Sequence, residues 1–253
     1  MDDFALTAEN LVIGYGERVV LRDLNFSVRP GEIFGVLGNS GCGKSTLLKN
    51  LIGIFTPLEG RITLLGEELD PARPDAFLKL MTRIGVTYQG GALFGSMTVA
   101  ENVALPLELH TGMSKAEIRE TVREKLALVD LADFGDFLPG ELSGGMRKRA
   151  GLARAIALDP QLLFFDEPSA GLDPLAAAGL DRLILSMREK LGVTVVVVTH
   201  ELDSIFAITD RVIVIDKHRK TIVAEGAPAE LLKHSPDPFV RSFLDRDGLK
   251  RSL

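Results

Sequence analysis

The chain has 253 residues, of which 46% are hydrophobic and 25% are charged. That composition is typical of a globular protein with a buried core, organised as one large α/β domain or two small ones. The formal net charge is −6 and no long block of Lys or Arg offsets it. We therefore expect no nucleic-acid partner.

Three features bear on where the protein works. The acidic start at residues 1–4 has no apolar region behind it, so we expect no secretory signal. No apolar run approaches the ~18 residues that cross a bilayer, so any work at a membrane requires another chain. The single cysteine, Cys42, excludes an internal disulfide and favours the cytoplasm. We interpret it as a small spacer residue rather than a redox switch.

The first third of the chain has the pattern of an antiparallel, turn-rich structure. Residues 24–28 alternate between apolar and polar, which predicts a strand with one solvated face. Residues 11–13 and 61–65 have the composition of further strands, separated by glycines. Tyr15 lies in a turn that offers its ring little core. It is either a surface tyrosine or a platform on which a flat ligand such as adenine stacks.

The stretch GNSGCGKST at residues 38–46 fits the phosphate-loop pattern G-x-x-x-x-G-K-[ST]. An apolar run at 33–37 precedes it, and apolar residues at helical spacing follow it to residue 54, so it joins a buried strand to a helix. An ordinary glycine-rich turn would not need this context. Lys44 supplies a charge for the outer phosphates, and the Ser45 hydroxyl is the expected Mg²⁺ ligand. The predicted phosphate-binding residues are Gly38, Asn39, Ser40, Gly41, Cys42, Gly43, Lys44, Ser45 and Thr46.

The middle of the chain is predicted to be helical, and strands and helices alternate after it. Ser114 and Glu117 fit a capping box at the start of one helix. A second helix is predicted at about 145–158, and an amphipathic helix at 180–191 ends at Gly192. Strands are predicted at 84–88, 162–166, 193–199 and 211–215. The overall prediction is a mixed α/β domain with a helical insertion.

Polar side chains follow three of these strands. Asp166 and Glu167 come directly after a buried strand, which is where open α/β sheets bind ligands. Asp166 can hold Mg²⁺, and Glu167 can orient or deprotonate an attacking water. His200 and Gln89 end two further strands, where they can reach the γ-phosphate and the metal or the water. The alternative, a solvated pair of acids at a strand end, does not account for the upstream phosphate loop.

The stretch Leu142-Ser143-Gly144-Gly145-Met146 precedes the second predicted helix. A serine and two glycines at a helix N-terminus make a second anion-binding end in a chain with only one phosphate loop. The second anion-binding helix end has a role if it completes the phosphate site of another copy of the chain. We therefore predict an ATP-dependent dimer.

The order of Tyr15, GNSGCGKST, Gln89, LSGGM, LLFFDEP, AGLD and His200 resembles that of the ATP-binding subunits of ABC transporters. The resemblance extends to about residue 226. It implies an ABC-type P-loop NTPase with a RecA-like mixed-sheet core and an antiparallel β subdomain at about 1–89 and 159–226. It places a helical subdomain at about 90–158 and a C-terminal tail at about 227–253.

The same resemblance implies a head-to-tail dimer with two ATP molecules between the subunits. Tyr15 would stack on adenine, His200 would contact the γ-phosphate and Glu167 would be the catalytic base. Asp173 would communicate across the dimer interface. The implied Mg²⁺ ligands are Ser45, Gln89 and Asp166. The residues implied to act on the partner's ATP are Ser143, Gly144, Gly145 and Met146. The family usually has Gln where this chain has Met146, which puts any polar contact from that position in doubt.

The LSGGM stretch, residues 91–111 and residues 236–244 resemble the Mla-type, mammalian-cell-entry-associated phospholipid transport ATPases. That resemblance implies a peripheral protein at the cytoplasmic face of the inner membrane, which powers lipid transport through an integral membrane permease. Further implied partners are a lipid-binding periplasmic subunit and a small cytoplasmic accessory subunit.

Three other functions are open. An importer ATPase for a small polar solute would have the same ATP-hydrolysing site and would differ in the segment after Gln89. A non-transport ABC ATPase usually has a coiled-coil insertion or two fused cassettes, which this chain lacks. A scaffold with a vestigial site would not need the intact catalytic residues. Within residues 91–101, Phe94, Met97 and Val99 either dock a membrane-protein helix or pack inside the helical lobe.

Overall fold

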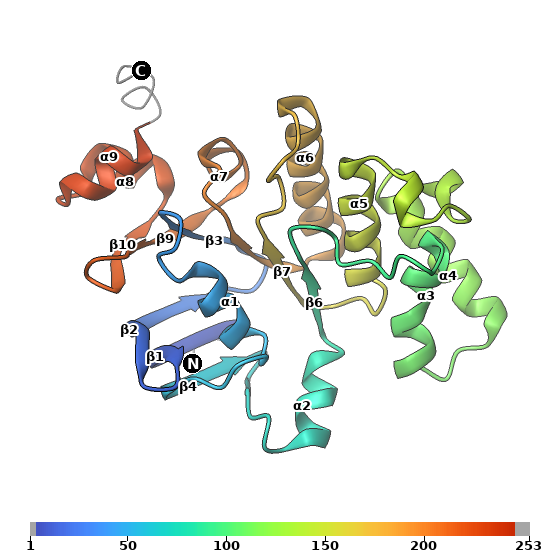
Figure 1. The fold of residues 1–253 in the computed structure, drawn as a ribbon, viewed down its shortest axis with the longest axis horizontal. Coiled ribbons are helices and arrows are strands. Elements are labelled where there is room, and N and C mark those ends of the chain that lie inside the picture. Colours follow the sequence, from blue (N-terminus) through green and yellow to red (C-terminus); the bar gives the residue numbers. More distant parts are fainter. Residues whose placement is uncertain (1–3, 246–253) are drawn as a thin grey trace. The chain divides into compact units, whose positions relative to one another are not determined.

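The computed structural model describes residues 4–245 of the chain (Figure 1). The chain divides into two compact units, one of residues 1–80 with 194–253 and one of residues 81–193. The acidic start predicted to lack a signal falls at residues 1–4 and so lies almost wholly outside the described residues. The end of the predicted tail, residues 246–253, lies outside them as well.

The first unit contains an antiparallel sheet with strand order β2-β1-β4-β5. Its buried side chains alternate along β1 and the second half of β2, as the alternating pattern predicts. The first two strands are longer than predicted, because β-bulges let the pairing of β1 with β2 continue past Leu11. The strands are β1 (Leu6–Tyr15), β2 (Arg18–Val28), β4 (Glu59–Leu64) and β5 (Glu67–Glu68).

The same unit contains a second group of strands in the order β10-β9-β3-β8. Strand β3 pairs in parallel with both β8 and β9, and every side chain of β3 and β8 is buried. Continuous burial explains why these strands, apart from Thr194, lack polar side chains and do not alternate. The strands are β3 (Ile33–Gly38), β8 (Thr194–Val198), β9 (Arg211–Asp216) and β10 (Thr221–Gly226).

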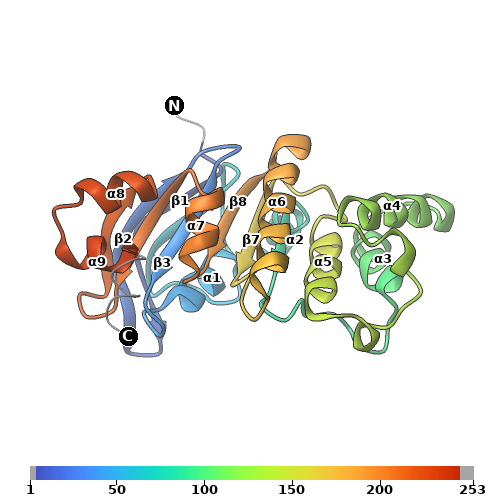
Figure 2. The same cartoon turned by 90° about the horizontal axis from the view of Figure 1, so that it is seen from above.

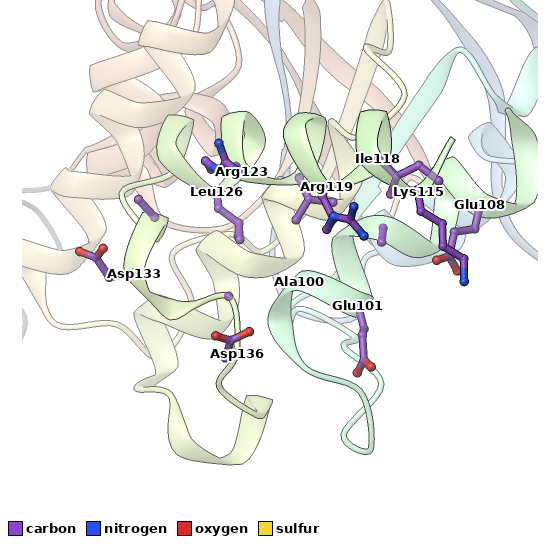
Figure 3. A pocket seen from close by; sticks show the side chains of 14 residues that line it. Ala100, Glu101, Glu108, Lys115, Ile118, Arg119, Arg123, Leu126, Asp133 and Asp136 are labelled. Atoms are coloured by element: carbon purple, nitrogen blue, oxygen red, sulfur yellow. The ribbon is translucent and has the colours of Figure 1, made fainter. Parts of the chain in front are cut away.

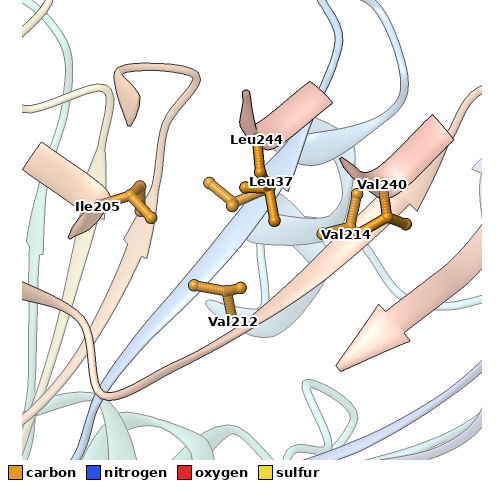
Figure 4. Close-up of a cluster of buried hydrophobic side chains, with 6 residues drawn as sticks. All are labelled: Leu37, Ile205, Val212, Val214, Val240 and Leu244. Atoms are coloured by element: carbon orange, nitrogen blue, oxygen red, sulfur yellow. The ribbon is translucent and has the colours of Figure 1, made fainter. Parts of the chain in front are cut away.

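Helices α1 (Lys44–Leu51), α7 (Leu202–Ile208), α8 (Pro228–His234) and α9 (Pro238–Leu244) belong to this unit. Val240 and Leu244 of α9 are fully buried against Leu37 of β3 and Val214 of β9 (Figure 4). Burying such side chains stabilises the fold by about 1.5–3 kcal/mol each. Helix α9 is therefore part of the core of this unit.

A half-buried arginine joins four chain segments of the first unit. Arg211 of β9 donates two hydrogen bonds to Glu32, of 2.8 and 3.0 Å, and one of 2.7 Å to the carbonyl of Ser27. It also forms an ion pair with Glu225 of β10 and lies 5.1 Å from the centre of the Phe34 ring. The planar guanidinium suits this bidentate, stacked arrangement. It fixes the end of β2 and the start of β3 to strands β9 and β10.

The second unit contains two parallel strands and four helices of three or more turns (Figure 2). Strand β7 has the predicted bounds, whereas the helix predicted at 180–191 begins earlier, because Asp173 and Pro174 supply a helix start there. It ends at Gly192, which has the left-handed backbone expected of a cap. The elements are β6 (Ile84–Thr87), α3 (Val99–His110), α4 (Lys115–Leu128), α5 (Gly144–Ala155), β7 (Leu162–Asp166) and α6 (Pro174–Leu191). Helix α2 (Pro74–Met81) ends at the boundary between the units, and single 3₁₀ turns occur at Ala132–Phe134 and Pro139–Glu141.

Both capping boxes of the second unit are complete. The predicted box joins Ser114 to Glu117 at the start of α4, and a second joins Thr98 to Glu101 at the start of α3. Each satisfies backbone N–H groups that a helix start leaves without a partner. The helices predicted at 44–54 and 145–158 are shorter, ending at Leu51 and Ala155.

Helix α5 lies directly on the main chain that follows β6. A Cβ atom on Gly151 would lie 2.9 Å from the carbonyl oxygen of Gly91, which is closer than real Cβ atoms tolerate. A Cβ atom on Gly91 would lie 2.8 Å from the carbonyl oxygen of Arg147. Arg154 also donates hydrogen bonds to the carbonyls of Gly91 and Ala92, of 3.1 and 2.9 Å. Glycine at both positions permits this contact between backbones.

Candidate functional site

The glycine-rich loop joins β3 to α1, as predicted. Gly38 at the end of β3 has a φ of 154°, and a Cβ atom there would lie 2.6 Å from the sulfur of Cys42 and 2.7 Å from the carbonyl oxygen of Ile215. Only glycine fits this position. Burial raises the pKa of the Cys42 thiol, which disfavours the reactive thiolate and supports its interpretation as a spacer.

The N-terminus of α1 opens onto this loop. Its capping residue is Gly43, with a φ of 109°, so no side chain caps the first N–H groups of the helix. Such uncapped groups, together with the helix dipole, form an anion-binding site. Lys44 is largely buried, and its Nζ donates hydrogen bonds to the carbonyls of Gly38 (2.7 Å) and Asn39 (3.4 Å). The lysine thus places a positive charge across the mouth of the loop, and Ser45 beside it is exposed.

Tyr15 is the last residue of β1 and is 49% exposed. Its hydroxyl lies 3.1 Å from Oγ1 of Thr46, and its ring meets Phe55 edge-on with centres 5.4 Å apart. These contacts tie the tyrosine to the first turn of α1 while leaving a ring face open. An open aromatic face beside a phosphate loop is compatible with stacking on a base, and that role stays a prediction.

His200 follows β8 and lines a cavity of about 360 Å³ with the start of the phosphate loop. The opposite wall consists of residues from α9, which the sequence analysis did not place in the site. The stacked pair Phe239 and Phe243, 6.0 Å apart, belongs to that wall. An Asp-Pro helix start followed by aromatic residues at i and i+4 was the available signal. The lining residues are Asn39, Ser40, His200, Leu202, Phe239, Ser242 and Phe243.

The second unit brings together Gln89, Asp166 and Glu167. Strands β6 and β7 run in parallel with Thr87 opposite Phe165, so the residues following each strand meet at one edge. Burial, and then the charge of Asp166, raises the pKa of Tyr88, which places Tyr88 close to that carboxylate. Gln89 is exposed, while Asp166 and Glu167 are half-buried.

The main chain at Glu167 is unusual and is held by a residue that the sequence analysis did not assign. Glu167 has a φ of +49°, in the left-handed region that residues with a Cβ seldom occupy. Lys148 of α5 donates hydrogen bonds to the carbonyls of Pro168 (2.6 Å) and Glu167 (3.3 Å). Burial lowers the pKa of Lys148. No local pattern links residues nineteen positions apart, so only the fold reveals the contact.

The LSGGM stretch starts α5, as predicted. Ser143 is the capping residue, and its Oγ accepts a hydrogen bond of 3.2 Å from the backbone N–H of Met146. Ser143 and Gly144 are exposed, and no acidic residue occupies the first turn, so the helix end is available to an anion. Asp173 caps α6, accepting hydrogen bonds of 3.0 Å from the N–H groups of Leu175 and Ala176. Its proposed part in communication between subunits stays a prediction.

A groove of about 670 Å³ lies on α3 and α4, with an apolar floor and charged rims (Figure 3). Ile118 and Leu126 contribute to the floor, and the rims carry both signs of charge. The charged lining residues are Glu101, Glu108, Lys115, Arg119, Arg123, Asp133 and Asp136. An apolar floor with charged rims is typical of surfaces that bind another protein.

The segment before α3 divides between core and surface. Val99 is fully buried, so its predicted place on a docking surface is wrong and the core alternative is right for this residue. It is buried because it occupies the first turn of the capped helix, facing inward. Phe94 is 52% exposed with Arg154 lying 5.8 Å from its ring centre, and Met97 is half-buried.

Residues 4–245 contain neither a helix suited to cross a membrane nor a metal-binding cluster of His, Cys, Asp and Glu side chains. No helix in that range is both long and apolar enough to cross a membrane. Nor do three or more His, Cys, Asp or Glu side chains within the described part of the chain gather as a metal site would require. The implied magnesium ligands are not such a cluster, because they include a serine and a glutamine.

Comparison with known proteins shows which family this chain resembles. A family model described as "ABC transporter" matches residues 21–170. The chain is 41% identical over 95% of its length to the probable ribonucleotide transport ATP-binding protein mkl of Mycobacterium tuberculosis, and spans 66% of that protein. It is 40% identical over 91% of its length to the intermembrane phospholipid transport system ATP-binding protein MlaF of Escherichia coli, and spans 84% of it.

Among solved structures, the chain is similar to a dimeric, post-hydrolysis state of the ATP-binding cassette MJ0796 bound to ADP and Pi. The TM-score is 0.79 at 29% identity, and the match covers 88% of this chain and 98% of that one. The similarity confirms the predicted fold class. The identity with MlaF confirms the predicted resemblance to Mla-type proteins.

Proposed function

This chain belongs to the ABC transporter family, and we propose that it is the ATP-hydrolysing subunit of a transporter that moves phospholipid or another hydrophobic molecule through a separate membrane permease. One observation carries the enzymatic part of the proposal. The uncapped N-terminus of α1 and the Lys44 ammonium face the same glycine-rich loop. That arrangement binds a polyphosphate.

The chemistry is phosphoryl transfer from ATP to water. The phosphates lie on the loop, Lys44 stabilises the outer ones and Tyr15 stacks on adenine. The residues assigned to Mg²⁺ offer hydroxyl, amide and carboxylate oxygens, the donors that this ion prefers. When bound, the ion neutralises charge on the phosphates. Glu167 accepts the proton of the attacking water, and His200 donates a hydrogen bond to the γ-phosphate.

The second copy of the chain completes each site. The α5 N-terminus, with Ser143, Gly144, Gly145 and the backbone of Met146, clamps the γ-phosphate held by the partner's loop. The dimeric state of MJ0796 with ADP and Pi supports this arrangement. Asp173 lies at the start of α6, where a partner could displace its capping interaction. The Met146 N–H already bonds to Ser143, so a glutamine side chain is not needed to shape the helix end.

The permease occupies the groove on α3 and α4. The groove is large enough to seat a short helix, and its rims offer charged partners to either end. Phe94 extends the apolar surface available before α3. The protein is thereby held at the cytoplasmic face of the inner membrane. A lipid-binding periplasmic subunit and a small cytoplasmic subunit are further proposed partners, and the similarity to MlaF of an intermembrane phospholipid transport system supports a complex with several subunits.

Phe94→Asp is expected to reduce recovery of the complex with the permease at least tenfold, because an exposed ring that anchors an interface is replaced by a charge. ATP hydrolysis by the isolated subunit should stay within about twofold of wild type. The matched control is Leu109→Asp, which changes a 67%-exposed leucine of α3 that does not line the groove. Equal losses for both variants, or none for Phe94→Asp, would exclude Phe94 from the docking surface.

The nature of the cargo is tested on the native complex. We expect purification through this subunit to recover a membrane protein with bound phospholipid, and added phospholipid to raise the ATPase rate about twofold or more. The similarity to mkl, a probable ribonucleotide transport ATP-binding protein, supports a second candidate, a polar cargo such as a ribonucleotide. Recovery of a nucleotide, sugar or amino acid, without any lipid stimulation, would select that candidate and leave the ATPase assignment intact.

A further inference from the structure

Lys148 contacts the main chain of the catalytic turn from within a tightly packed pocket. Its Nζ lies 2.6 Å from the carbonyl oxygen of Pro168 and 3.3 Å from that of Glu167. The remaining space beside its stem, lined by residues including Leu152 and Phe165, is about 10 Å³. That is about the least that holds a water molecule, so little empty space remains beside the lysine stem.

The backbone of Glu167 needs such support. A φ of +49° is disfavoured for any residue with a Cβ, and it persists only where surrounding contacts hold it. The N–H of Ala170 donates a hydrogen bond of 3.3 Å to the carbonyl of Glu167, closing a turn. Lys148 donates to the same carbonyl and to the next one, and its charge strengthens both bonds.

The other basic residues of α5 have different targets. Arg147 donates to the carbonyl of Leu142 (2.6 Å), and Arg149 to that of Val129 (3.1 Å). Arg154 donates to Gly91 and Ala92. Among the basic side chains of this helix, Lys148 alone has hydrogen bonds to the main chain at Glu167 within the described structure.

We propose that Lys148 is a positioning residue for hydrolysis, which holds the Glu167–Pro168 turn so that the Glu167 carboxylate points at the attacking water. The inference rests on the proposed function, because it requires Glu167 to act on that water. It adds a link between the two ATP sites of the dimer. Ser143 begins α5 and Lys148 lies on its second turn, so a shift of the helix end that clamps one ATP also moves the turn that serves the other.

The test compares three variants of the full-length protein. Lys148→Met keeps the length and packing of the stem but removes the donor, and we expect kcat to fall about 10- to 100-fold, as small misplacements of a catalytic group do. ATP affinity and KM should stay within about twofold, since the phosphate loop is untouched. Lys148→Arg retains a charged donor and should recover at least half of the wild-type kcat. Arg149→Met removes a neighbouring charge on the same helix and should lower kcat less than about threefold.

The outcomes separate positioning from packing. The inference would be overturned if Lys148→Met and Lys148→Arg lowered kcat equally. It would also be overturned if Lys148→Met raised KM and left kcat unchanged. In a Glu167→Gln background, Lys148→Met should cause no further loss in single-turnover rate, because it acts through the missing carboxylate. If Lys148→Met does not fold, Lys148→Gln replaces it, with a kcat expected between those of Lys148→Arg and Glu167→Gln. Full activity in Glu167→Gln would instead refute the proposed role of Glu167 as the catalytic base, whereas full activity in Lys148→Met or Lys148→Gln alone refutes only the positioning role.

Discussion

Replacing Glu167 by glutamine is expected to lower kcat for ATP hydrolysis at least 100-fold while ATP affinity stays within about threefold. Glu167 and Asp166 are the two carboxylates at the end of β7, and Asp166 is assigned to the metal. An amide of the same shape preserves the turn but cannot accept the proton of the water. Steady-state hydrolysis and equilibrium ATP binding, measured on the same preparation, give the two quantities.

The same substitution should trap the dimer. Because bound ATP is no longer consumed, size-exclusion chromatography with ATP and Mg²⁺ should show a stable dimer that ADP does not produce. Glu189→Gln, on the exposed face of α6, is the matched control and should behave as wild type. Turnover by Glu167→Gln near the wild-type rate would reject Glu167 as the base.

Mixing two inactive variants is expected to restore activity. Lys44→Ala removes the charge at the phosphates and should weaken ATP binding at least tenfold. Ser143→Arg places a bulky side chain at the exposed start of α5 and should block the clamp. A dimer with one subunit of each kind has one intact composite site, so an equal mixture should reach about a quarter of wild-type activity if subunits pair at random.

The readout is the number of ATP molecules retained per dimer together with the rate. One retained ATP per mixed dimer supports a site shared between subunits. Full activity of Ser143→Arg by itself, or ATP sites that are complete in an isolated monomer, would contradict it. The rate and the retained ATP of Lys44→Ala alone and of Ser143→Arg alone provide the baseline.

Local sequence patterns predicted most helices and strands. The features that the sequence analysis missed depend largely on tertiary contacts. The bounds of β7 and the box at Ser114 follow from short-range composition and hydrogen bonding. The box at Thr98 has the same signal and could have been found, which would have placed Val99 in a helix start. The left-handed backbone at Glu167 could not have been predicted, because the residue there is not glycine or asparagine, which favour that conformation. The hydrogen bonds that support it come from Lys148 of another element.

The α9 wall beside His200 illustrates a second limit. Its residues are separated from His200 by about forty positions, and only the packing of Val240 and Leu244 on the strands carries Phe239 and Phe243 to the cavity. Sequence periodicity identifies a buried face but does not say which loop the opposite face borders.

The close contact between Gly91 and Gly151 determines what can move. The two backbones touch without side chains between them, so no change of side-chain rotamer can relieve a relative displacement. Arg154 adds a hydrogen bond between the same two segments. We therefore expect the loop after Gln89 and helix α5 to move together as one rigid body. If the proposed permease binds at Phe94, a displacement there is expected to move α5, including its Ser143 end, because Gly91 and Ala92 are held against that helix.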